Sequence, residues 1–165
     1  MALIDVVLSR RSIRRYEERE VPEEVLEKIL EAGRQAPSAS NKQPWHFIVV
    51  ADEGIKERLS QGRWNSFIRD SAFTVVGCGY AGDAYGRRWS TVDTTIALQN
   101  MVIAAWSLGV GSCWIGDFKE GEVKKLLNIP GSWKVIALIS FGYPAEHPGS
   151  KQKKPIEEIV GRDRF

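Results

Sequence analysis

The first third of the chain carries apolar residues at spacings of three and four, the pattern of amphipathic helices. It predicts a short helix over residues 2–9 and a second that begins at Pro22, a residue suited to a first helical turn, and ends near Gly33. Further helices are predicted over residues 53–61, 91–108 and 121–127. The stretch from Ile96 to Leu108 is apolar almost all round, so we expect a buried helix there.

Three short runs are rich in β-branched residues: 46–51, 73–79 and 134–142. Runs that are apolar at successive positions fit strands of a sheet covered by helices on both sides. Because helices and strands do not alternate regularly, we predict an α+β fold with a central mixed sheet packed by helices. No linker or internal repeat divides the chain, so residues 1–165 are expected to form one domain. The tail from Glu146 to Phe165 has the composition of an extended arm.

Composition narrows the classes of function. The 165 residues are 43% hydrophobic and 27% charged, as in globular proteins, and the net charge is +2. So small an excess of positive charge argues against nucleic acid as a partner. The two cysteines lie far apart and only two histidines accompany them, which suggests neither disulfides nor a metal site and favours the cytoplasm. The longest apolar run is well short of the ~20 residues that cross a bilayer, so no membrane association is expected.

The densest positive charge follows the first predicted helix. It consists of four arginines with a serine among them: Arg10, Arg11, Ser12, Arg14 and Arg15. The planar guanidinium group offers donors that match the oxygens of a phosphate or carboxylate, so this cluster is a candidate anion site. The alternative is a solvated surface neutralised by the neighbouring acids Glu17, Glu18 and Glu20.

A second candidate is the polar connection at residues 36–45, between a helix end and a strand. Its hydroxyl and amide groups, on Ser38, Ser40, Asn41 and Gln43, can serve the edge of a ring that carries carbonyls and nitrogens. The alternative is an ordinary solvent loop whose serines and asparagine cap the next element.

A third candidate is the turn and short apolar strand from Gly109 to Gly116. Its glycines would let the backbone approach a ligand closely, although Gly109 also fits the left-handed cap of the preceding helix. The segment matches neither the dinucleotide fingerprint nor the P-loop. Cys113 in this segment is a potential nucleophile, but no histidine is near it in the sequence, so we expect a small buried thiol.

In combination these segments resemble the FMN-dependent nitroreductases, also called NAD(P)H:flavin oxidoreductases. The resemblance rests on Arg10-Arg11-Ser12-Ile13-Arg14, on the block from Ala36 to Phe47, on Leu108 to Gly116, and on a lysine pair before Pro155. They occur in the family's order and span essentially the whole chain. Each motif alone is weak, whereas the arginine start together with the P-S-x-x-N-x-Q-P-W block is specific.

The resemblance implies a homodimer with two FMN molecules at the subunit interface, and a C-terminal arm that reaches over the partner subunit. It implies cofactor contacts for Arg10, Arg11, Ser12, Arg14, Pro37, Ser38, Ala39, Asn41, Gln43, Trp114, Ile115, Gly116, Lys151 and Lys153. The arginine segment would approach the phosphate, ribityl chain and ring edge. The loop 37–41 would come from the partner subunit, and the lysines would reach the phosphate. Lys153 stands where the family often has arginine.

The activity implied is transfer of hydride from NAD(P)H through FMN to a nitroaromatic, quinone, flavin or similar small acceptor, by a ping-pong mechanism. The flavin would carry the chemistry, so no catalytic side chain is expected. Two alternatives stay open: a flavin-binding or flavin-sensing protein without turnover, and a relative of the same fold that fragments flavin or removes halogen reductively.

Overall fold

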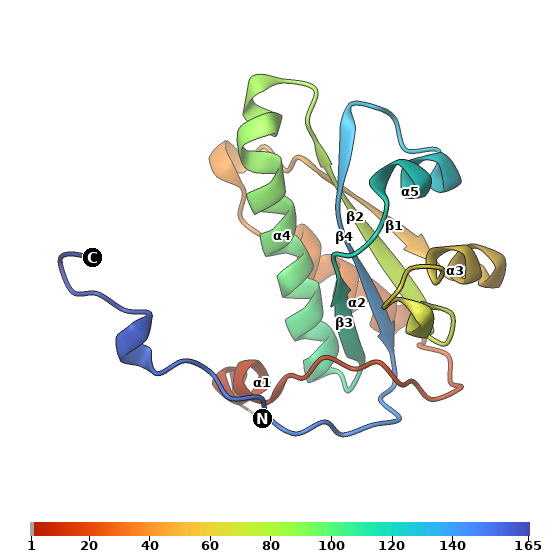
Figure 1. The fold of residues 1–165 in the computed structure, drawn as a ribbon, viewed down its shortest axis with the longest axis horizontal. Helices are drawn as coiled ribbons and strands as arrows, with labels where there is room; N and C mark the ends of the chain where they lie inside the picture. The colour runs from red at the N-terminus through yellow and green to blue at the C-terminus, as the bar shows by residue number, and fades with distance from the viewer. Residues whose placement is uncertain (1) are drawn as a thin grey trace.

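Four strands build one sheet in the computed structural model, which describes residues 2–165 (Figure 1). The strands are β1 (Trp45–Val50), β2 (Phe73–Tyr80), β3 (Gly111–Ile115) and β4 (Trp133–Gly142). The α-helices are α1 (Leu3–Ser9), α2 (Glu23–Arg34), α3 (Glu53–Leu59), α4 (Ala84–Ser107) and α5 (Glu120–Leu127). These elements confirm the predicted α+β class, and every predicted helix and strand is present with bounds that differ mainly at the ends.

The strands lie in the order β1-β2-β4-β3, and each neighbouring pair is antiparallel. The expected mixed sheet is therefore wrong for the pairings among these four strands. The parallel component in residues 2–165 is a single bridge, between Ser12 and Ser112. It lies on the outer side of β3, an edge strand, and it brings the arginine segment against the sheet. Pairing direction depends on distant contacts, which the local pattern does not contain.

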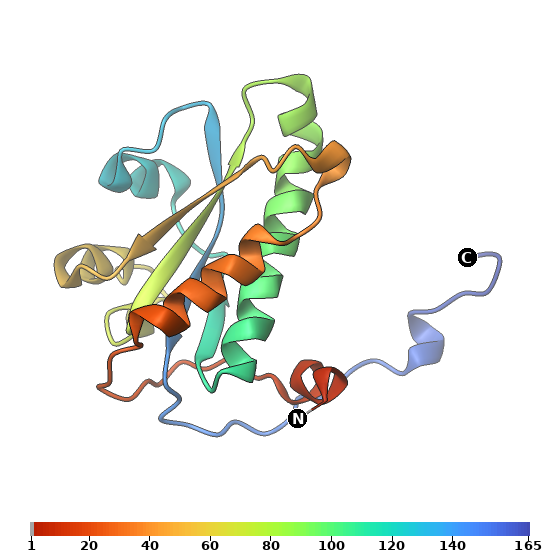
Figure 2. The ribbon, with the colours of Figure 1, turned by 180° about the vertical axis from the view of Figure 1, so that it is seen from behind.

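Helices cover both faces of the sheet, as the strands' uninterrupted apolar runs predicted (Figures 1 and 2). On one face Phe73, Val75 and Phe141 pack with Leu98 and Met101 of α4 in a buried cluster that also includes part of α2. On the other face the alternate strand residues, such as Val76 and Leu138, pack with α3, α5 and the turn before β2. Side chains of successive strand residues point to opposite faces, so one strand serves both clusters.

The long helix α4 runs the length of the first face. It begins at Ala84, earlier than the predicted residue 91, because the side chain of Asp83 accepts a hydrogen bond from the backbone N–H of Gly86 and caps the first turn. Small residues allow its close packing: a Cβ on Gly33 of α2 would lie 2.2 Å from Cε of Met101. None of the helices in residues 2–165 combines the length and apolarity that crossing a bilayer requires.

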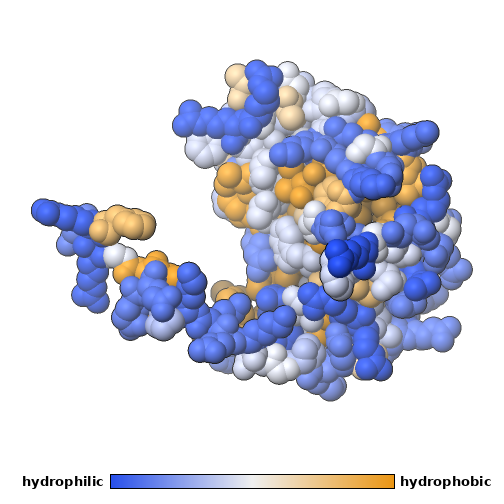
Figure 3. Space-filling model, viewed as in Figure 1, coloured by the Kyte–Doolittle hydropathy of each residue, from blue (hydrophilic) through white to orange (hydrophobic). Residues whose placement is uncertain are grey.

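Two segments stand outside this packed body. In α1 only Val6 is buried, whereas its other apolar side chains, Leu3, Ile4, Val7 and Leu8, are exposed. The C-terminal arm leaves β4 and extends away from the sheet, with a short 3-10 turn at Ile156–Glu158 (Figures 1 and 2). Figure 3 shows apolar side chains on the arm separated from the main body. The predicted extended arm is confirmed.

Packing of α4 on the sheet predicts a large loss of stability for Leu98→Ala. Leu98 is fully buried, and truncating such a residue removes apolar contacts and leaves a cavity, at a cost of about 2–5 kcal/mol. Denaturant unfolding of the variant measures this loss. The control is Gln99→Ala, an exposed position in the same helix turn, which should change the free energy of unfolding by less than about 0.5 kcal/mol. Equal effects of the two substitutions would contradict the packing described.

Candidate functional site

Main-chain hydrogen bonds hold the arginine segment against the edge of the sheet. Ile13 is fully buried, and its N–H donates to the carbonyl of Ser112 in β3 at 2.9 Å. The N–H of Ala145 donates to the carbonyl of Arg15 at 2.9 Å, so the start of the C-terminal arm fixes the other end. The backbone N–H of Arg14 donates to Oε1 of Glu146 at 2.6 Å. The segment is thus a fixed part of the structure between two β-type contacts.

Tyr16 also holds the arginine segment against the sheet. Its hydroxyl donates to the carbonyl of Ile13 at 2.8 Å and lies 2.7 Å from Oγ of Ser140 in β4. Burial raises the pKa of Tyr16 far above its ordinary value, so the hydroxyl keeps its proton at neutral pH. Sequence reasoning missed this residue, because its partner in the sheet, Ser140, lies more than a hundred positions away.

The arginines are not neutralised by the acids that follow them. None of the ion pairs among residues 2–165 involves an arginine of this cluster. Arg11 differs from the others, since its guanidinium donates to the carbonyls of Leu8 and Arg10 at 2.9 and 3.0 Å and closes the end of α1. Arg10 and Arg14 make no side-chain hydrogen bond within the described part of the chain. Arg15 makes none either, so three guanidinium groups of this cluster are free to bind an anion.

The first and third candidate clusters meet at Cys113. Its thiol is buried in β3, and burial raises its pKa, while the positive charges of Arg14 and Arg10 and a hydrogen bond from Ser12 act in the opposite direction. These influences place Arg10 and Arg14 near the strand. Cys113 itself is a neutral buried thiol, which agrees with the structural role favoured from the sequence.

The segment Trp114–Gly116 lies where β3 ends. Ile115 is buried in the second hydrophobic cluster, so its side chain belongs to the core and only its backbone can meet a ligand. Gly116 is exposed just beyond the strand. One edge of β3 pairs with β4, and on the outer edge the bridge from Ser12 reaches only Ser112. The outer edge of β3 past Ser112 is thus available to a ligand.

The polar loop Pro37–Gln43 lies beside the N-terminal half of α4, where Ala39 contacts Tyr85 and Asp93. A short 3-10 turn at Ala39–Asn41 shapes it, and three residues adopt positive φ: Ser40 at 50°, Asn41 at 53° and Gln43 at 50°. Oγ of Ser38 accepts a hydrogen bond from the N–H of Gln43 at 2.9 Å, and Nε2 of Gln43 donates to the carbonyl of Asn41 at 3.2 Å. The loop therefore has a defined shape, with the Asn41 and Gln43 side chains at the surface.

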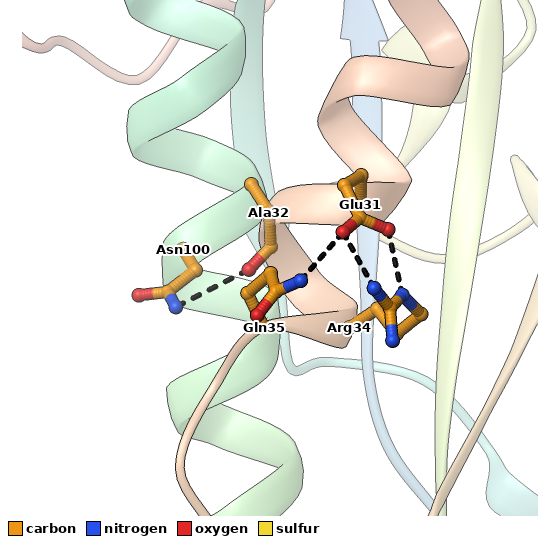
Figure 4. A network of polar contacts seen from close by, with 5 residues as sticks. All are labelled: Glu31, Ala32, Arg34, Gln35 and Asn100. Carbon is orange, nitrogen blue, oxygen red and sulfur yellow. Dashed lines mark hydrogen bonds and ion pairs between the residues drawn. The ribbon is translucent and has the colours of Figure 1, made fainter.

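The end of α2, from which this loop departs, is held by a polar network (Figure 4). Glu31 accepts hydrogen bonds from Arg34 at 2.6 and 2.7 Å and from Gln35 at 2.7 Å, which lower the pKa of its carboxyl to about 2. Nδ2 of Asn100 in α4 donates to the carbonyl of Ala32 at 3.3 Å. The helix end is consequently fixed to α4 before the loop begins.

Within one chain the loop and the arginines are far apart. Ala39 is bonded to Asp93 of α4, whereas the region of Ser9 is bonded to Trp106 near the other end of that helix. From Asp93 to Trp106 the helix is about 20 Å long, at roughly 1.5 Å per residue. The loop lies beside the N-terminal half of α4 in both views of the ribbon (Figures 1 and 2). The structure does not bring these two candidate clusters together in a single subunit.

The lysines assigned to the same site lie on the arm. Lys151 and Lys153 are exposed, and neither takes part in a hydrogen bond or ion pair with another described residue. Their approach to a phosphate stays a prediction. The structure instead reveals two residues that sequence reasoning overlooked, Asp93 and Tyr85, which contact the loop from α4. The available signal in the sequence was Asp93 itself, a single acid within the long apolar helix.

Comparison with known proteins agrees with these features. The model of the nitroreductase family matches residues 7–69 and 58–143. A protein of Methanothermobacter thermautotrophicus, provisionally named NADH dehydrogenase/NAD(P)H nitroreductase, is 36% identical over 157 residues, which cover 92% of this chain and 82% of the relative. A Thermus thermophilus protein named NADH dehydrogenase is 29% identical over 188 residues, which cover 93% and 92% of the two chains.

Solved structures share the fold over the whole chain. NfrA2 of Bacillus megaterium superimposes with a TM-score of 0.95 at 25% identity, covering 100% of this chain and 76% of that one. The NADPH:FMN oxidoreductase of Vibrio harveyi, solved in complex with NAD⁺, gives a TM-score of 0.94 at 25% identity, covering 99% and 77%.

Burial of both cysteines predicts slow alkylation in the folded protein. Desolvation raises the pKa of Cys78 to about 11 and raises that of Cys113 too, and only the thiolate reacts. At pH 8 about one Cys78 in a thousand is then ionised, and this fraction grows as the pH approaches 11. Iodoacetamide labelling followed by mass spectrometry should be at least 100-fold slower than in guanidinium-unfolded protein. Native labelling at the unfolded rate would contradict the burial.

Proposed function

Because the chain belongs to the nitroreductase family, we propose that it is an FMN-dependent oxidoreductase that draws reducing equivalents from NAD(P)H and delivers them to a small organic acceptor. Acceptors in this proposal are nitroaromatics, quinones or free flavins, reduced in a ping-pong cycle at one shared site. The Vibrio harveyi neighbour, an NADPH:FMN oxidoreductase solved in complex with NAD⁺, supports the choice of cofactor and donor.

The observation that carries the proposal is the pair of unpaired guanidinium groups on Arg10 and Arg14. A cation without a carboxylate partner, on a backbone fixed by Ile13 and Tyr16, is prepared to bind an anion without rearrangement. FMN carries a phosphate at one end and a ring that gains negative charge on reduction at the other. Arg10 and Ser12 fit the phosphate end, and Arg14 fits the edge of the ring at which negative charge accumulates on reduction.

Bound FMN would supply the hydride and electron chemistry itself. The chain's own groups bind and orient: the free edge of β3 at Trp114–Gly116 offers main-chain groups to the ring, and the buried Ile115 keeps that backbone in place. Arg11 is better assigned to closing α1 than to the cofactor, since its guanidinium is already bonded to two carbonyls.

A homodimer with shared sites would unite the separated clusters. Loop Pro37–Gln43 and the arginines lie at opposite ends of α4, so a second subunit can bring its loop to the first subunit's arginines. Apolar side chains left in water by one chain support such an assembly; they are Leu3, Ile4, Val7 and Leu8 of α1, Trp89, Val92 and Ile96 of α4, and Ile156, Ile159 and Val160 of the arm.

In that dimer the arm reaches over the partner subunit and its exposed residues Lys151 and Lys153 add positive charge at the phosphate. The two free buried cysteines suit a reducing compartment, and we place the enzyme in the cytoplasm.

Substitution of Arg10 tests the phosphate site. Arg10→Ala should weaken FMN binding tenfold or more, because a charge-assisted hydrogen bond is worth roughly 1.5–3 kcal/mol. The control is Arg19→Ala, which removes an arginine that instead lies over the ring of Tyr143 at 3.8 Å. Flavin fluorescence titration measures both affinities. Equal affinities in the two variants, or FAD as the cofactor released from the native protein, would refute the assignment.

Mixing two inactive variants tests the shared site. In a heterodimer of Arg10→Ala and Asn41→Ala subunits, one site carries both lesions and the other carries neither. Random exchange makes half the dimers mixed, so about a quarter of the wild-type NAD(P)H oxidation should return. Each variant alone is the control. If subunit exchange is demonstrated by mass spectrometry and no activity returns, the site is not shared.

A further inference from the structure

We propose that Asp93 is a positioning residue for the flavin, and that it acts with Tyr85 by fixing the loop Pro37–Gln43 to α4; this inference rests on the proposed function. Asp93 is only 2% exposed, although it is an acid in the middle of the long buried helix. No ion pair in residues 2–165 involves it, so neutral donors must stabilise its carboxylate. The two donors are the N–H of Ala39, which belongs to the loop, and the hydroxyl of Tyr85, which also contacts the loop.

The contacts converge on one residue of the loop, Ala39. The N–H of Ala39 donates to Oδ1 of Asp93 at 3.2 Å. The hydroxyl of Tyr85 lies 2.9 Å from Oδ2 of Asp93 and 2.5 Å from the carbonyl oxygen of Ala39. Both polar groups of the Ala39 residue are therefore held from α4. Asp93 and Tyr85 are eight residues apart, slightly more than two turns, which puts them on the same side of the helix.

The hydroxyl of Tyr85 remains a donor at neutral pH. Burial and the adjacent Asp93 carboxylate both raise the pKa of Tyr85, to about 12. Its single proton is shared between two acceptors, the carboxylate and the Ala39 carbonyl. The arrangement is a small closed network whose outer member is the loop backbone.

The loop needs such an attachment because its own conformation is strained. Three residues with side chains, Ser40, Asn41 and Gln43, lie in the left-handed region, which costs of order 1 kcal/mol each and persists only where surrounding contacts hold it. The hydrogen bonds from Gln43 to Ser38 and Asn41 stay within the loop, so they shape it without fixing it in space. Asp93 and Tyr85 provide the link from its tip to the body of the protein.

Four variants separate this role from general stability. Asp93→Ala removes the acceptor for the Ala39 N–H. Asp93→Asn keeps that acceptor through its amide oxygen and can donate its NH₂ to Tyr85, so it should preserve the loop. Tyr85→Phe removes only the hydroxyl. The matched control is Thr94→Val, the adjacent fully buried residue, whose hydroxyl has no hydrogen-bond partner.

Two readouts are measured on the full-length protein. The first is the rate of trypsin cleavage after Lys42, an exposed lysine inside the loop, in flavin-free protein. The second is the dissociation constant for FMN by flavin fluorescence. For Asp93→Ala we expect cleavage at least tenfold faster and FMN binding at least tenfold weaker, and for Tyr85→Phe severalfold changes in both. Asp93→Asn and Thr94→Val should stay within about threefold of wild type. Thermal unfolding of each flavin-free variant accompanies the series, and Tyr85→Phe carries the test if Asp93→Ala does not fold.

Unchanged cleavage at Lys42 in Asp93→Ala and Tyr85→Phe would overturn the inference, whatever the flavin affinity. Faster cleavage with unchanged FMN affinity would show an anchored loop that does not serve the flavin, and this too would overturn it. Absence of FMN binding by the wild-type protein would instead refute the proposed function, and the cleavage rates would still report whether Asp93 holds the loop.

Discussion

The burial of α4 along one face of the sheet is the constraint on which the other features depend. Leu98 and Met101 fill the space above β2 and β4, and Gly33 lets α2 approach the same helix closely. The two ends of α4 then determine where the functional segments can lie. The polar loop is attached to its N-terminal half through Asp93, and α1 and the arginines lie near its C-terminal end through Trp106.

Edge strand β3 is the second organising element. An exposed strand edge presents unpaired main-chain groups, which proteins usually cover. Here the arginine segment covers only the beginning of β3, through Ile13 and Ser112, so two cations are placed next to a stretch of free backbone. The same pairing therefore protects part of the edge and positions charge beside the rest. Tyr16 fixes this arrangement further, because its hydroxyl is hydrogen-bonded to Ser140 of the neighbouring strand β4.

Much of the fold was predictable from local patterns, because strand runs such as 73–79 and the buried helix carry their own periodicity. The early start of α4 was not, since Gly86 and the arginines after it interrupt the apolar pattern and the cap of Asp83 decides the boundary. The candidate segments were also recognised from their residue types. The roles of individual residues within these segments were not predictable. Arg11 caps a helix while Arg10 remains free, and Asp93 contacts Ala39, and these roles depend on contacts that form only on folding.

The left-handed residues of the polar loop have a consequence for the entropy of ligand binding. Glycine would remove the steric cost at Ser40, Asn41 and Gln43, but it would delete their hydroxyl and amide groups and widen the range of conformations open to the chain. The loop keeps polar side chains at strained positions and restricts them by its internal bonds and by α4. A molecule that binds there meets groups already ordered, so little conformational freedom remains to be lost.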